Sequence, residues 1–190
     1  MDWKSQLRSL EEGEQWDVAI ELLQNIIRAY PEDMDPYICM NFLLMDLLVE
    51  EDYDQSKRND YQVLLKWYFY ESYAKFSHNA EYLYFTAKTA EICEFFLGID
   101  QRLYENMIEQ AKTLDPNNPI YKENYYWSLR EKNPVDPELI FYAKMVVEHN
   151  SPVKKYLETK GRIGRYLLGM KENWCKRVLR NAERLQKDAH

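Results

Sequence analysis

The feature of this sequence that most constrains its fold is an apolar pattern that recurs along the chain. One copy has apolar residues at relative positions 0, 1, 4, 5, 8 and 11: Leu103, Tyr104, Met107, Ile108, Ala111 and Leu114. These offsets place all of the side chains on one face of an α-helix. Full copies also begin at Val18 and Trp174, and partial copies begin at Val63 and Leu139. Successive copies start 45, 40, 36 and 35 residues apart, which is about the length of a helix pair.

A second stretch that favours a helix precedes each copy of this pattern. These stretches cover residues 2–12, 35–49, 79–97, 119–131 and 153–168. No segment alternates apolar and polar residues as a strand with one exposed face does. The sequence therefore predicts an all-α chain of about five antiparallel helix pairs, in which residues 1–190 form a single domain.

Residues that break helices fall where successive pairs are expected to meet. The clearest case is the segment Asp-Pro-Asn-Asn-Pro at residues 115–119. Pro116 has no N–H and disfavours a helical conformation at Asp115, whereas Pro119 suits the first turn of a helix. We therefore expect one helix to end before Pro116 and the next to begin at Pro119.

The spacing of these pairs and several of their residues resemble the tetratricopeptide repeat, a helix pair of about 34 residues. The matching residues are Trp3 and Leu10 on the first helix of the first pair, Trp16, Ala19, Leu23 and Pro31 on its second helix, and Ala111 with Pro116 at the end of a later unit. The resemblance implies a right-handed stack of helix pairs, an αα superhelix. The first helices of such a stack line an inner groove that binds protein segments.

The resemblance also implies which residues face this groove. They are Ile38, Phe42, Met45 and Asp46 in the second unit, and Glu123, Trp127, Arg130 and Glu131 in the fourth. We expect these side chains to contact a protein partner.

The charges are divided unevenly along the chain. Residues 1–153 carry 14 Lys and Arg against 28 Asp and Glu, a net charge of −14, whereas residues 154–190 carry 11 against 4, a net charge of +7. We expect the last helix pair, at about 153–187, to form a basic C-terminal cap on the stack. Its basic residues either neutralise part of the acidic body or meet a charged partner.

The residues that enzymes and metal sites require are scarce. The chain has three histidines and three cysteines, and none of them has the spacing of a metal-ligand motif. Its five glycines form no phosphate-binding loop. We therefore expect no catalytic residue, no metal and no cofactor, and we interpret the chain as a non-enzyme.

The apolar runs and the cysteines bear on membrane insertion and on the cellular compartment. The most apolar run, FLLMDLLV at residues 42–49, is short and contains Asp46, so we expect no membrane insertion. An odd number of widely spaced cysteines fits reduced thiols better than a disulfide framework. We therefore expect a cytoplasmic protein.

Aromatic residues are concentrated in runs at 66–73, 81–85 and 121–127. Consecutive aromatic side chains cannot all point inward on a helix, and Tyr and Trp are typical anchors of protein interfaces. We therefore expect a non-catalytic module that holds one protein partner. That partner is expected to be basic, because most of the chain is acidic.

Small helical proteins of this kind resemble toxin-neutralising immunity proteins, secretion chaperones and regulatory adaptors, and we expect one of these roles. The alternative is binding of nucleic acid or of an anionic surface through the basic C-terminal helix. The net charge of −7 disfavours this alternative, because the acidic body would repel phosphates. The sequence does not indicate an oligomeric state.

Overall fold

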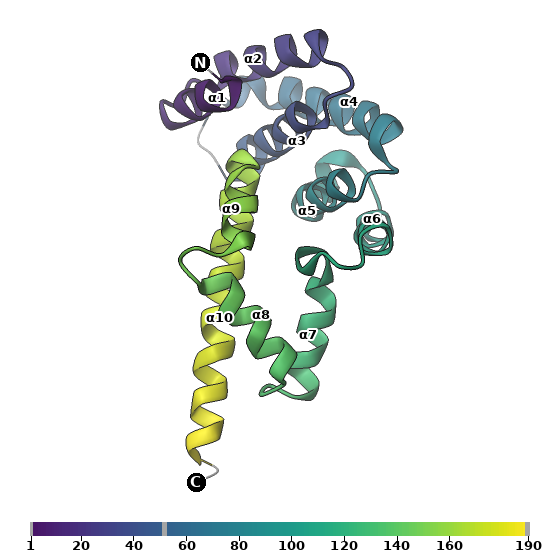
Figure 1. Cartoon of the computed structure of the whole chain (residues 1–190). Helices are drawn as coiled ribbons and strands as arrows, with labels where there is room; N and C mark the ends of the chain where they lie inside the picture. Colours follow the sequence, from purple (N-terminus) through teal and green to yellow (C-terminus); the bar gives the residue numbers. More distant parts are fainter. Residues whose placement is uncertain (1, 51–52, 189–190) are drawn as a thin grey trace. The chain divides into compact units, whose positions relative to one another are not determined.

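The computed structural model describes residues 2–50 and 53–188, and across these ranges the chain is helical and contains no strand (Figure 1). The predicted all-α fold is therefore confirmed. The α-helices are α1 (Trp3–Glu12), α2 (Trp16–Ala29), α3 (Met34–Val49), α4 (Arg58–Phe76), α5 (Ala80–Leu97), α6 (Gln101–Leu114), α7 (Glu123–Lys132), α8 (Pro137–Val147), α9 (Pro152–Glu158) and α10 (Gly161–Asp188). Two short 3-10 helices, η1 (Gln55–Lys57) and η2 (Pro119–Lys122), precede α4 and α7.

The chain divides into two compact units, unit 1 (Met1–Asp115) and unit 2 (Pro116–His190). The boundary falls inside the Asp-Pro-Asn-Asn-Pro segment, where α6 ends at Leu114 and η2 begins at Pro119, as the prolines predicted. The range over which the sequence predicts one stack of helix pairs, residues 1–190, is thus divided between two units. Unit 1 contains α1 to α6, and unit 2 contains α7 to α10.

Short polar side chains fix the beginnings of many of these helices. In each case an Asp, Asn or Ser side chain accepts a hydrogen bond from a backbone N–H in the first turn, which satisfies a donor that the helix itself leaves without a partner. These residues are Asp2 for α1, Asp33 for α3, Asn79 for α5, Asp100 for α6, Asp136 for α8 and Ser151 for α9. Asp33, Asn79 and Ser151 lie between predicted pairs, so these boundaries also contain the residue that starts the next helix.

In unit 1 each helix packs against the next one along the chain, and α3 also packs against α5. Because α3 contacts α2, α4 and α5, it is the central helix of the unit, and every residue from Pro36 to Leu48 except Cys39 is buried. Ala19 of α2 and Ala111 of α6 are completely buried. Part of the apolar pattern that repeats in the sequence is thus buried in this unit, whereas Val18, Val63 and Leu114 of the same copies are exposed.

In unit 2 both α8 and α9 pack against α10. The last helix pair predicted by the sequence, at about 153–187, consists of one helix at 153–168 and a second one over the copy of the apolar pattern that begins at Trp174, and this division is wrong. The structure instead has a short α9 of 7 residues and a continuous α10 of 28 residues. The chain turns at Gly161, whose φ of +65° lies in the left-handed region that favours glycine. Gly169 lies within α10 and does not interrupt it.

The close approach of α9 and α10 depends on a second glycine. A Cβ atom added to Gly164 would lie 1.7 Å from the carbonyl oxygen of Leu157 and 2.7 Å from its carbonyl carbon. Only a residue without a side chain fits there. Gly169 is different, because a Cβ atom added to it would meet no atom within 4 Å.

These two glycines make a matched pair of variants. We expect Gly164→Ala to lower the free energy of unfolding, because the added methyl group would collide with backbone atoms. The decrease should be roughly 1–3 kcal/mol or more, since this is the usual cost of overpacking a core. Gly169→Ala should instead stabilise the protein by roughly 0.5–1 kcal/mol, because alanine loses less entropy than glycine in an exposed helix. Urea unfolding followed by circular dichroism measures both values. Similar changes in the two variants would contradict this account of the α9–α10 contact.

Candidate partner-binding cleft

A cleft with a volume of about 90 Å³ lies within unit 2. Helix α7 contributes three of its lining residues, α8 contributes one, and α10 contributes the rest (Figure 1). The lining residues are Glu123, Tyr126, Trp127, Tyr142, Met170, Lys171, Trp174 and Arg177. Aromatic and basic side chains therefore meet at one place in this unit.

Two aromatic pairs form the walls of the cleft. The rings of Tyr126 and Tyr142 are stacked, with centroids 3.9 Å apart and an interplanar angle of 9°. The rings of Trp127 and Trp174 lie 5.2 Å apart at 39°. Trp127 is 40% exposed, whereas Trp174 is 8% exposed. An accessible indole thus rests on a buried aromatic layer.

The titratable groups of this aromatic layer are unsuited to proton transfer at neutral pH. Desolvation by burial raises the pKa of Tyr126 to about 12, and burial also raises the pKa of Tyr142. The thiol of Cys175, next to Trp174 in the sequence, likewise has its pKa raised by burial to about 12. All three groups therefore remain protonated at neutral pH and offer no general base.

The charged residues of the cleft differ in what they contact. Lys171 is only 6% exposed, and its Nζ lies 3.1 Å from Oε2 of Glu123. The guanidinium of Arg130 lies over the ring of Trp127, 5.5 Å from its centroid. Arg177 is exposed and makes no ion pair with any residue that the structure describes. The cleft thus has an internal charge pair at its base and an available guanidinium at its edge.

One buried polar atom of the cleft also lacks a partner. The Nε1 atom of Trp174 is buried and has no hydrogen-bond acceptor in the part of the chain that the structure describes. Buried tryptophan N–H groups usually have an acceptor.

The residues predicted to face a groove have two different positions in the structure. Ile38, Phe42, Met45 and Asp46 lie on the central helix α3 and are at most 5% exposed. They are buried in this structure because helices surround α3, so they present no open surface. On α7, Glu123 and Trp127 line the cleft and Arg130 covers Trp127, whereas Glu131 is exposed and is not among the lining residues.

The sequence reasoning did not identify the other lining residues. Tyr126 belongs to the aromatic run at 121–127, and Arg177 belongs to the basic C-terminal helix, so both signals were visible in the sequence. What the sequence did not reveal was that these two segments line the same cleft. Tyr142, Met170, Lys171 and Trp174 carry no separate sequence signal for the cleft.

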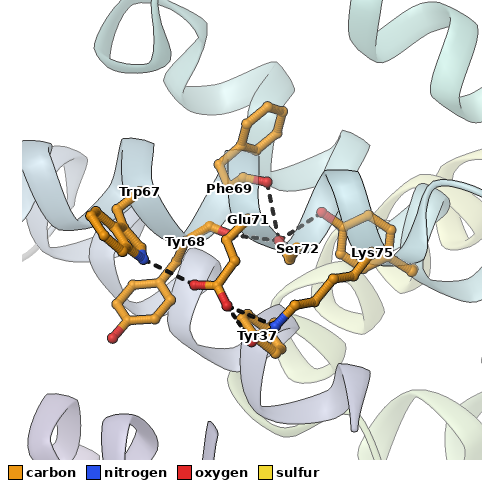
Figure 2. A network of polar contacts seen from close by, with 8 residues as sticks. Tyr37, Trp67, Tyr68, Phe69, Glu71, Ser72 and Lys75 are labelled. Atoms are coloured by element: carbon orange, nitrogen blue, oxygen red, sulfur yellow. Dashed lines mark hydrogen bonds and ion pairs between the residues drawn. The ribbon is translucent and has the colours of Figure 1, made fainter. Parts of the chain in front are cut away.

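A second group of polar residues lies in unit 1, around Glu71 on α4 (Figure 2). Glu71 is at its centre, where Oε1 accepts hydrogen bonds from Tyr37 Oη at 2.8 Å and from Lys75 Nζ at 2.7 Å. Its other oxygen, Oε2, accepts a hydrogen bond from Trp67 Nε1 at 2.9 Å. Lys75 also donates to Tyr37 Oη at 2.7 Å.

Ser72, the next residue on α4, makes a separate set of polar contacts in the core of unit 1. Its hydroxyl lies 2.8 Å from Tyr82 Oη and accepts a hydrogen bond from Asn41 Nδ2 at 3.2 Å. These contacts join α3, α4 and α5. Because Glu71 and Lys75 already bind each other, we interpret the network as a structural connection between helices.

The aromatic run on α4 contributes a further exposed surface. Trp67 and Tyr70 are 66% and 50% exposed, whereas Phe69 is fully buried. The expectation that consecutive aromatic residues cannot all point inward is therefore confirmed. The indole N–H of Trp67 is already bound to Glu71.

No protein-family model, curated protein or solved structure matches this chain. Among residues 2–50 and 53–188, no three His, Cys, Asp or Glu side chains are grouped so that they could hold a metal ion. In the same ranges no helix has the length and apolar character needed to cross a membrane.

The Glu71 network predicts a pH dependence of stability. Burial alone would raise the pKa of Glu71, but hydrogen bonds from Lys75, Tyr37 and Trp67 outweigh it and lower the pKa below 4.5. A carboxylate with a lowered pKa stabilises the fold above its unfolded pKa, and this contribution is lost as the pH falls through the folded value. Unfolding free energies measured in urea from about pH 6 to about pH 3 should therefore fall less steeply for Glu71→Gln than for the unmodified protein.

The control for this experiment is Glu21→Gln on α2, because Glu21 is exposed and makes no hydrogen bond with the described residues. At neutral pH we expect Glu71→Gln to cost roughly 1.5–3 kcal/mol, the usual contribution of a hydrogen bond to a charged group. Identical pH profiles for the two variants would mean that Glu71 is not stabilised in this way.

Proposed function

We propose that this chain is a non-catalytic protein-binding module that holds one protein partner, and that the cleft of unit 2 is its binding site. The observation that carries this proposal is Trp127, a half-exposed indole supported by the buried Trp174. Residues that dominate binding energy are enriched in Trp, Tyr and Arg and lie in well-packed pockets. All three residue types line this cleft.

We also propose that the helix pairs of unit 1 form a right-handed, tetratricopeptide-like stack. The order of helix contacts supports this proposal, because α3 packs against its own partner α4, against the preceding α2 and against the following α5. In a stack of helix pairs, each pair buries its apolar face against its neighbours. The predicted basic C-terminal cap, at about 153–187, corresponds in this proposal to α9 and α10.

The roles that fit such a module are those of an immunity protein, a secretion chaperone or a regulatory adaptor in the cytoplasm. Unit 1 carries 10 Lys and Arg against 23 Asp and Glu, a net charge of −13. This excess supports a partner with a basic surface opposite unit 1, because complementary charge accelerates encounter and selects against wrong partners.

The alternative function is binding of nucleic acid or an anionic surface through α10. Unit 2 carries 15 Lys and Arg against 9 Asp and Glu, a net charge of +6. The exposed basic residues of α10 include Lys176, Arg177, Arg180, Arg184 and Lys187. Binding of this kind would weaken steeply with salt and would respond similarly to the loss of any one of these residues.

Trp127→Ala tests the proposed site. The protein, used as bait in an extract of its native host, should recover one stoichiometric partner that mass spectrometry identifies. For that purified partner we expect Trp127→Ala to raise the dissociation constant roughly 30-fold or more. Truncation of a central aromatic residue of an interface costs about 2 kcal/mol or more of binding free energy.

Phe141→Ala is the control, because Phe141 is 69% exposed on α8 and does not line the cleft. This variant should bind the partner as the unmodified protein does. Circular dichroism establishes that both variants are folded. Equal affinities of the Trp127→Ala and Phe141→Ala variants would move the binding site away from the cleft.

A further inference from the structure

We infer that the cleft of unit 2 takes one aliphatic side chain from a partner segment that carries an Asp or Glu beside it. This inference rests on the proposed function and specifies the chemistry of the segment that enters the cleft. The charge of this segment is negative, whereas the partner surface expected to face the acidic unit 1 is positive.

The size of the cleft limits the anchor side chain. An engineered protein cavity of about 150 Å³ accommodates benzene, whereas this cleft has a volume of about 90 Å³. A Val, Leu, Ile or Met side chain fits such a volume, and an indole is too large for it. Met170, which is 51% exposed at the cleft, has a flexible side chain that adapts to aliphatic groups.

The composition of the walls favours an apolar group in the same way. The stacked Tyr126–Tyr142 pair and the Trp127–Trp174 pair present ring surfaces. The ammonium group of Lys171 already contacts Glu123. An aliphatic side chain between these rings therefore displaces water without breaking an existing ion pair.

The charges at the edge select an acidic neighbour for this anchor. Arg177 lines the cleft and has no ion pair among the described residues, and its guanidinium can bind a carboxylate through two parallel hydrogen bonds. Arg130 adds a second positive charge near the cleft, because its guanidinium lies over the ring of Trp127. A Lys or Arg in the same place would be repelled by both residues and by the net charge of +6 on unit 2.

The buried Nε1 atom of Trp174 is consistent with an occupant that brings an oxygen atom. This N–H has no acceptor in the described chain, and an unsatisfied buried donor destabilises the structure that contains it. A segment with a backbone carbonyl or carboxylate next to its aliphatic group can supply such an acceptor.

Four synthetic peptides test the inference on the full-length protein. Each has eight residues, blocked ends and a fluorescein label, and binding is measured by fluorescence anisotropy. The first peptide carries Leu between two Glu residues in a Ser and Gly background. In the others, both Glu residues become Lys, or Leu becomes Ala, or Leu becomes Trp.

We expect the Glu-Leu-Glu peptide to bind at least tenfold more tightly than each of the other three. Tighter binding of the Lys peptide would overturn the charge assignment, and tighter binding of the Trp peptide would overturn the size assignment. Absence of binding by all four peptides up to about 1 mM would overturn the inference as a whole.

Charge reversal on α10 gives the matched controls. Arg177→Glu should weaken binding of the Glu-Leu-Glu peptide at least tenfold and should strengthen binding of the Lys peptide. Arg184→Glu should change the affinity for either peptide by no more than about twofold. Arg184 is an exposed arginine of the same helix that does not line the cleft. Equal effects of the two reversals would show a general attraction to α10 and would contradict a defined carboxylate site.

The failure of this inference can be distinguished from the failure of the proposed function. If the host partner depends on Trp127 but its bound segment is basic or neutral, the inference is wrong and the proposed site survives. If the partner binds the Trp127→Ala variant normally, the proposed site is itself wrong.

Discussion

The contact between the backbone of Gly164 and the carbonyl group of Leu157 determines how unit 2 is built. A Cβ atom at Gly164 would lie 1.7 Å from that carbonyl oxygen, so the start of α10 rests directly on the end of α9. Arg177 lies 13 residues further along the same helix, or about 20 Å at 1.5 Å per residue. A small tilt at the first turn would therefore displace Trp174 and Arg177 from α7, and the cleft would lose its shape.

The sequence predicted the helices well because their signals are local. The apolar pattern, the prolines and the short polar side chains at helix starts act within a few residues, so α1, α3 and α5 nearly coincide with their predicted ranges. The helices of unit 2 were harder to predict, because glycine at 161 and glycine at 169 could each end a helix, and the residue type alone does not show which one does. Only the backbone conformation and the neighbouring atoms determine that the chain turns at the first glycine and continues as a helix through the second.

The candidate site was predictable only in part, for the same reason. Trp127 was identified as a binding residue, but its supporting Trp174 is 47 residues away in the sequence, and a sequence pattern does not reveal which face of α10 lies near α7. Ile38 and Phe42 were predicted to face a groove on the same grounds as Trp127, namely the resemblance to the tetratricopeptide repeat, but they are buried. The pattern marks the faces of α3 but does not reveal that three helices surround it.

The pairing of Trp127 with Trp174 has a consequence for observing this protein. Trp3, Trp16 and Trp67, the remaining tryptophans, all belong to unit 1, so unit 2 contains only this pair. Two indoles whose centroids are 5.2 Å apart are close enough for their intense far-ultraviolet transitions to couple, which gives a characteristic far-ultraviolet dichroism band. That band depends on the mutual orientation of the rings. The cleft therefore contains its own optical reporter, and replacing Trp3, Trp16 and Trp67 by Phe would leave its signal free of any other indole.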